Sequence, residues 1–149
     1  MMLRRTHLAI GLASAFYFIP RVNSKIIFLV AVIISTMLPD LDRGMNFFKL
    51  DFWTGKNPGP GHRGFLHSYT ICILIALFLA FVYPILALPF FLGYSLHLFA
   101  DSFTVKGIRP FWPLRIISSG KITTGGKVEA VIFFVFLLID VFLVVFWFV

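Results

Sequence analysis

Charged residues are scarce in this 149-residue chain: Asp, Glu, Lys and Arg make up 13% of it, about half the share typical of soluble domains. Six residues are acidic, 13 are Lys or Arg, and four are His, whereas 60% are apolar and 20 of these are Phe. So many apolar side chains need lipid to cover them. The composition therefore disfavours a cytosolic, disordered or nucleic-acid-binding protein, and the length predicts one integral-membrane domain over residues 1–149.

Cysteine is almost absent. Cys72 stands alone inside an apolar run, so the chain has neither a disulfide framework nor a cysteine-based zinc motif. We interpret it as a small buried hydrophobic residue.

Five apolar stretches account for the apolar excess and predict an all-α membrane bundle of four to five transmembrane or re-entrant helices. They are Leu8–Ile19, Ile26–Leu38, Tyr69–Tyr83, Ile85–Ala100 and Val131–Val149. A spanning helix needs about 17–25 apolar residues, and only the fifth stretch reaches that length without its flanks. The first two are short, and are expected either to cross as short spans or to form a re-entrant pair.

The basic residues predict the orientation. With either arrangement of the first two stretches, the N-terminus and the loops 39–68 and 101–128 lie on one side, together with eleven of the 13 Lys and Arg residues. Arg21 and Lys25 lie on the other. Because basic loops stay in the cytoplasm, we expect a multi-pass protein of the cell (inner or plasma) membrane with the N-terminus and large loops cytoplasmic.

All four histidines and most of the acids fall on this same side, near the membrane surface. His97 and Asp101 are four residues apart, which places them on one face of a helix, one turn apart. This spacing suits two ligands of one ion, or an Asp that orients a metal-binding His. The alternative is a structural hydrogen bond.

The remaining candidates lie at the ends of apolar stretches. Asp40 and Asp42 follow Pro39, which ends the second stretch and presents both carboxylates at the membrane edge. His62 and His67 precede the third stretch. Imidazole and carboxylate ligands without thiolate suit a catalytic site for a divalent metal, with Zn²⁺ favoured and Mn²⁺ or Fe²⁺ as alternatives.

The predicted metal ligands are His7, Asp40, His62, His67, His97 and Asp101. They exceed the needs of one tetrahedral ion, so one or two ions are expected, and a two-metal site would clamp a scissile phosphoester. The predicted catalytic residues are Asp42, His62 and Arg63. Asp42 would be a general base or would orient a ligand, and Arg63 or Lys106 would hold an anionic group.

Four motifs in order carry a family resemblance. They are Thr6–Gly11 (THLAIG), Leu38–Asp42 (LPDLD), His62–Ser68 (HRGFLHS) and Gly93–Thr104 (GYSLHLFADSFT), followed by Gly107 and Trp112-Pro113. Over nearly the whole chain, this pattern resembles the YdjM-type membrane proteins, also described as LexA-binding, inner-membrane-associated, metal-dependent hydrolases. The resemblance implies a small polytopic membrane protein with metal-dependent hydrolase activity. No residue here accounts for LexA binding.

The ligand order is also similar to that of zinc-dependent phospholipase C and related nucleases, which cut phosphodiesters. This chain has no histidine after His97, so the further His-x-x-x-Asp/Glu pair of those enzymes is missing and three metals are not expected. The sequence thus favours a hydrolase that attacks a lipid or interfacial ester, most readily a phosphoester, with metal-activated water. Membrane lipids and a lipid-phosphate substrate are the expected partners, nucleic acid is not, and the oligomeric state stays open.

Two other functions use the same features. A metal transporter or sensor would bind the ion without chemistry. A non-catalytic scaffold would recruit a cytosolic regulator through the basic loops, and would depend on residues such as Lys121 and Lys127 rather than on His67 and His97.

Overall fold

The computed structural model describes residues 2–43, 66–114 and 116–148, and within these ranges the chain is helical without a named strand. The helices are α1 (Arg4–Phe18), η1 (Ile19–Arg21), α2 (Lys25–Met37), η2 (Leu38–Arg43), α3 (Tyr69–Val82), α4 (Pro84–Ser102) and α5 (Lys127–Phe148). The expectation of an all-α bundle is therefore confirmed.

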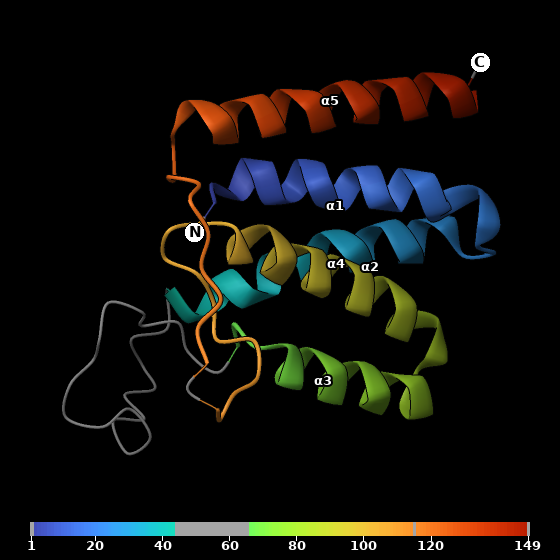
Figure 1. The fold of residues 1–149 in the computed structure, drawn as a ribbon. Coiled ribbons are helices and arrows are strands. Elements are labelled where there is room, and N and C mark those ends of the chain that lie inside the picture. The colour runs from blue at the N-terminus through green and yellow to red at the C-terminus, as the bar shows by residue number, and fades with distance from the viewer. Residues whose placement is uncertain (1, 44–65, 115, 149) are drawn as a thin grey trace.

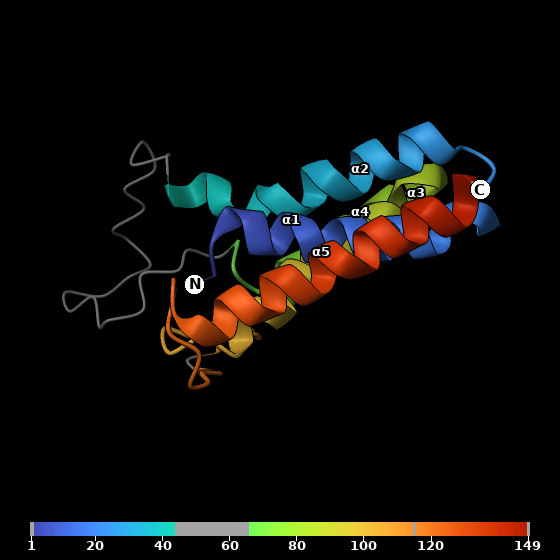
Figure 2. The same cartoon turned by 90° about the horizontal axis from the view of Figure 1, so that it is seen from above.

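The five α-helices run up and down along one common direction (Figures 1 and 2). The start of α1, the end of α2 with η2, the start of α3, the end of α4 and the start of α5 all lie at one end of the bundle (Figure 1). The C-terminus and the turns α1–α2 and α3–α4 lie at the other end. Five segments far apart in the sequence are thus brought to a single end, which we call the site end.

Helix α4 is the centre of the bundle, since it packs against α1, α2 and α3, whereas α5 packs against α1 alone among the described elements. Local sequence sets the helix limits. Tyr83 precedes Pro84 and is not helical, as expected before a proline, and Pro84 opens α4 at a position where its missing N–H costs nothing. At the site end, the Ser68 hydroxyl caps α3 by accepting a hydrogen bond from the Thr70 amide at 3.1 Å.

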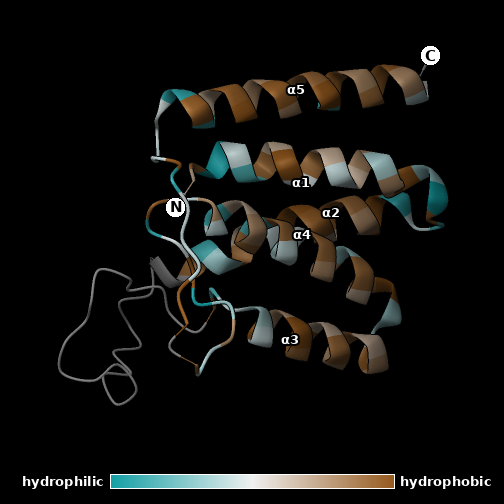
Figure 3. Ribbon diagram, viewed as in Figure 1, coloured by the Kyte–Doolittle hydropathy of each residue, from teal (hydrophilic) through white to brown (hydrophobic). Residues whose placement is uncertain are grey.

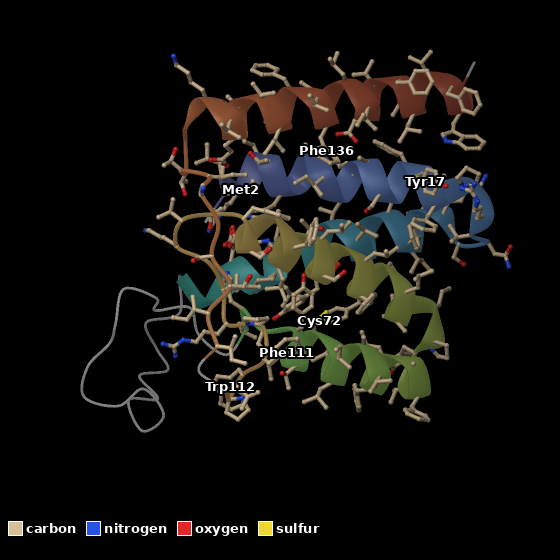
Figure 4. The ribbon with its side chains drawn as sticks, viewed as in Figure 1. Met2, Tyr17, Cys72, Phe111, Trp112 and Phe136 are labelled. Atoms are coloured by element: carbon tan, nitrogen blue, oxygen red, sulfur yellow. The ribbon has the colours of Figure 1, made fainter. Side chains whose placement is uncertain are left out.

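Two small groups of buried apolar side chains hold the helices together. Cys72, Phe90, Tyr94, Leu98 and Ile108 form one, between α3, α4 and the segment after α4. In Figure 4, Cys72 lies between α3 and α4, as expected for a buried hydrophobic residue. The second group consists of Ala15, Phe28 and Val32, between α1 and α2.

The outer surface of the bundle is apolar. Figure 3 shows hydrophobic residues along the helices and polar ones gathered mainly at the two ends. Two helices, α4 with 19 residues and α5 over 21, are long and apolar enough to cross a membrane. The helices α1, α2 and α3 have 15, 13 and 14 residues, about 20–22 Å at 1.5 Å per residue, against a hydrocarbon core of about 30 Å. Four to five crossings therefore stay a prediction.

Gly93 sets the close approach of α4 to α2. A Cβ atom there would lie 2.5 Å from the Val32 carbonyl oxygen and 2.9 Å from Thr36 Oγ1. Because one of these atoms belongs to the backbone, α2 would have to move.

We expect Gly93→Ala to lower the free energy of unfolding by about 1–3 kcal/mol, the usual cost of overpacking. Thermal unfolding in detergent measures this. Ala80→Val on the exposed surface of α3 is the control, and an equal loss in both variants would contradict the close-packing account.

Candidate metal centre

Five predicted ligands meet at the site end. His7 lies in the first turn of α1, Asp40 in η2, His67 just before the cap of α3, and His97 and Asp101 in the last turns of α4. Each is buried, with at most 3% of its surface exposed. Four separate segments thus contribute imidazole and carboxylate groups to one protected region.

Asp101 is the common neighbour of the three histidines. Its Oδ1 atom lies 3.4 Å from His7 Nε2, and its Oδ2 atom lies 3.8 Å from His97 Nε2 and 3.9 Å from His67 Nε2. The i, i+4 spacing of His97 and Asp101 therefore does place both groups on one face of α4. Asp40 also belongs to the cluster, with its Oδ1 atom 3.9 Å from His97 Nε2.

These side chains form two overlapping groups that could hold a metal ion. One consists of His7, His97 and Asp101, and the other of Asp40, His67 and His97. Within each group, the potential ligand atoms lie within 4.8 Å of one another. Since His97 belongs to both, the arrangement can serve one ion or two neighbouring ions.

The hydrogen bonding of the histidines fits a cation. Neither ring nitrogen of His7 nor Nε2 of His97 makes a hydrogen bond within the described part of the chain. The two rings stack with their centroids 3.8 Å apart, so protonating both would place two positive charges in contact. Buried polar atoms without partners are costly. A divalent ion would satisfy the lone pairs of neutral imidazoles and the charge of both Asp40 and Asp101.

The orientation of the His97 ring is fixed by a contact of its Nδ1 atom with the backbone of α2. Its Nδ1 lies 2.8 Å from the Thr36 carbonyl oxygen, which only accepts hydrogen bonds. The proton of a neutral ring must therefore sit on Nδ1, leaving the lone pair of Nε2 directed at the two carboxylates. A carbonyl behind a ligand histidine is a common device for fixing its tautomer at metal sites.

The N-terminal segment completes the surroundings of Asp101. The backbone amide of Met2, a residue 3% exposed, donates a hydrogen bond of 2.7 Å to Asp101 Oδ1. Figure 4 shows Met2 at the start of α1, at the site end. Arg4 Nε lies 3.7 Å from Asp40 Oδ2, on a side chain that is 67% exposed. The carboxylates are thus held by the chain itself.

Sequence reasoning did not find the role of Glu129. This residue of α5 is 1% exposed and accepts hydrogen bonds from the Leu3 amide, the Thr6 hydroxyl at 3.1 Å and the Gly125 amide at 2.6 Å. It therefore ties the first turn of α5 to the start of α1, next to His7. The sequence signal that could have indicated this role is the position of Glu129: it is one of only six acidic residues, and it lies in the first turn of an apolar helix.

Other predicted site residues are not placed at the cluster. His62 and Arg63 lie outside the described residues, and Asp42 lies in η2 with its side chain outside the description. Lys106 is exposed in the segment that follows α4. The roles predicted for these four residues stay predictions.

Glu129→Gln tests the tether between α5 and α1. The substitution keeps the volume but removes the charge that accepts three hydrogen bonds and places an amide N–H₂ among donors. We expect unfolding to become easier by about 1–3 kcal/mol, the cost of leaving buried polar groups unsatisfied. Thermal unfolding in detergent is the measurement. Lys127→Gln, at an exposed position of the same helix turn, should show no change, and equal stability of the two variants would contradict the tether.

Comparison with known proteins supplies the family. The family model described as YdjM inner membrane protein matches residues 1–148, nearly the whole chain. No curated protein and no solved structure matches the chain. The match agrees with the two helices that can cross a membrane and with the resemblance carried by the four sequence motifs. The chain belongs to the family of YdjM inner membrane proteins.

Proposed function

We propose that this membrane protein is a metal-dependent hydrolase that acts on a lipid or interfacial ester, with a phosphoester as the favoured class. The observation that carries the proposal is the buried cluster of three imidazoles and two carboxylates, whose ligand atoms converge from four segments of a helical bundle. Zn²⁺ is the favoured ion, and Mn²⁺ and Fe²⁺ are alternatives, because nitrogen and oxygen ligands without thiolate suit all three.

His7, Asp40, His67, His97 and Asp101 would hold the ion. A divalent ion at such a site supplies a Lewis acid and activates water for attack on an ester. The protein's part is to keep the ligands oriented, through the Thr36 carbonyl on His97 and the Met2 amide on Asp101, and to exclude bulk water by burying them.

Charge favours an anionic substrate. With neutral imidazoles and ionised carboxylates, the cluster carries two negative charges. One divalent ion would neutralise them, and two divalent ions would give the site a net positive charge. A second ion would thus leave a positive site for a phosphate group. Arg63 and Lys106 are proposed to hold that group, and Asp42 is proposed as a general base.

The predicted placement of the site at a membrane surface supports a lipid substrate. The site end gathers the N-terminus and the segments next to both large loops. The N-terminus and the two loops together contain eleven of the 13 basic residues of the chain. We propose that this end faces the cytoplasm, at the level of the headgroups, where basic residues are retained and attract anionic lipids.

Metal content tests the centre. We expect the purified protein to carry one or two equivalents of Zn²⁺ or Mn²⁺ by elemental analysis. His97→Gln and Asp101→Asn, which keep the volume of each side chain, should weaken the affinity by more than about tenfold, since even groups that only orient ligands contribute that much. Lys121→Ala, an exposed change in the loop before α5, should retain the metal. Unchanged metal content in a folded Asp101→Asn protein would overturn the proposed centre.

Turnover tests the chemistry. In detergent micelles or liposomes, we expect the protein to hydrolyse phosphoester lipids, to stop when the metal is removed by a chelator, and to recover when Zn²⁺ or Mn²⁺ is returned. Asp101→Asn should be inactive, and Lys121→Ala should be active. A folded, metal-loaded protein that hydrolyses no ester would contradict the hydrolase and favour a metal sensor or transporter. Activity that survives metal removal would contradict the mechanism.

A further inference from the structure

An apolar groove lies along α2, between this helix and α3 with α4. Its volume is about 390 Å³, within the range of small-molecule sites, and ten side chains line it. Ile26 lies at its far end, Leu38 at the site end, and Leu79 and Phe90 contribute from α3 and α4. The groove thus follows nearly the full length of α2.

The lining offers no hydrogen bond to an occupant. Its one polar side chain is Ser35, whose Oγ lies 3.0 Å from the Val32 carbonyl oxygen and 3.2 Å from that of Pro89. This hydroxyl is therefore used within the contact between α2 and α4. The other nine side chains are hydrocarbon, so the occupant that fits is hydrocarbon as well.

The groove is extended along α2. From Ile26 to Leu38 the chain advances twelve residues, about 18 Å along a helix, slightly more than half of the hydrocarbon core of about 30 Å. A groove of this length accommodates one acyl chain of a lipid lying along α2.

The site end of the groove is formed by a segment that also contributes to the candidate metal centre. Leu38 lines the groove and lies two residues before Asp40, and Ser35 lines it next to Thr36, whose carbonyl contacts His97. One helix therefore contributes both an apolar wall and the surroundings of the polar cluster. This continuity distinguishes the groove from the surface of α5, which is also apolar but belongs to a helix that packs against α1 and not against α3 or α4 (Figure 1).

We propose that this groove binds one acyl chain of a lipid whose phosphoester headgroup lies at the metal centre. The position of the headgroup rests on the proposed function, whereas the acyl chain in the groove does not. A lipid bound in this way keeps its tail in the hydrocarbon layer and needs no transfer of the chain into water. The enzyme then selects a long-chain lipid phosphoester over a water-soluble one.

Photo-crosslinking in nanodiscs tests the groove without requiring turnover. Phosphatidic acid would carry a diazirine either at the end of an acyl chain or close to the glycerol, and mass spectrometry would locate the adducts. We expect adducts on the groove-facing residues of α2, α3 and α4 to exceed those on the exposed surface of α5. The terminal label should react near Ile26, and the glycerol-proximal label near Leu38. Equal labelling of the groove and of α5, or the reverse polarity, would overturn the proposal.

Two matched variants sharpen the test. Ala31→Trp fills the groove with a bulky side chain and should abolish the groove adducts, whereas Val131→Trp, on the exposed surface of α5, should keep them. Thermal unfolding and metal content show whether each variant is folded. If Ala31→Trp does not fold, the unaltered protein still tests the proposal, through the distribution of adducts and through the positions of the two labels along the groove. Adducts that link two protein chains at the groove would assign it to a second copy and overturn the lipid.

The two proposals fail in different ways. Groove adducts with the expected polarity in a protein that hydrolyses no ester would retain the lipid site and reject the hydrolase. Hydrolysis of soluble and long-chain phosphoesters at equal kcat/KM, with no excess of adducts in the groove, would retain the hydrolase and reject the lipid site.

Discussion

Two carboxylates and three imidazole rings share a region at the end of an apolar bundle, where each has lost nearly all contact with solvent. Among them, the ring nitrogens of His7 and Nε2 of His97 make no hydrogen bond within the described residues, which is costly for buried polar atoms. The stacked rings of His7 and His97 make protonation of both rings unfavourable. A divalent cation would resolve the conflict, and the side chains around it form two groups that could hold one.

Contacts between the helices position the groups of the cluster. The close contact of α4 with α2 at Gly93 places the Thr36 carbonyl behind His97, and Glu129 ties α5 to the start of α1 beside His7. The Met2 amide then reaches Asp101. A chain with few polar residues thus uses mainly backbone groups and one buried acid to orient its candidate ligands. Residues of α2 and η2 line the apolar groove, and their neighbours in sequence, Thr36 and Asp40, belong to the surroundings of the polar cluster.

Much of this could be predicted because short-range spacing decides it. A His and an Asp four residues apart must share a face of α4, and prolines mark the ends of apolar stretches, so the gathering of polar residues at one end followed from the alternation of helices. Contacts between helices could not be predicted in the same way. That His7 would meet Asp101, and that Glu129 would accept amides from the start of α1, depends on packing that no local pattern encodes. The short first and second apolar stretches correspond to α1 and α2, and α3 is likewise shorter than a straight crossing.

X-ray absorption at the metal edge of the purified, metal-loaded protein tests the central claim most directly. The account predicts an ion bound by nitrogen and oxygen atoms at about 2.0–2.2 Å, with the multiple-scattering signature of more than one imidazole. Sulfur at about 2.3 Å, or an ion surrounded by oxygen without imidazole, would contradict a centre built from these histidines and carboxylates.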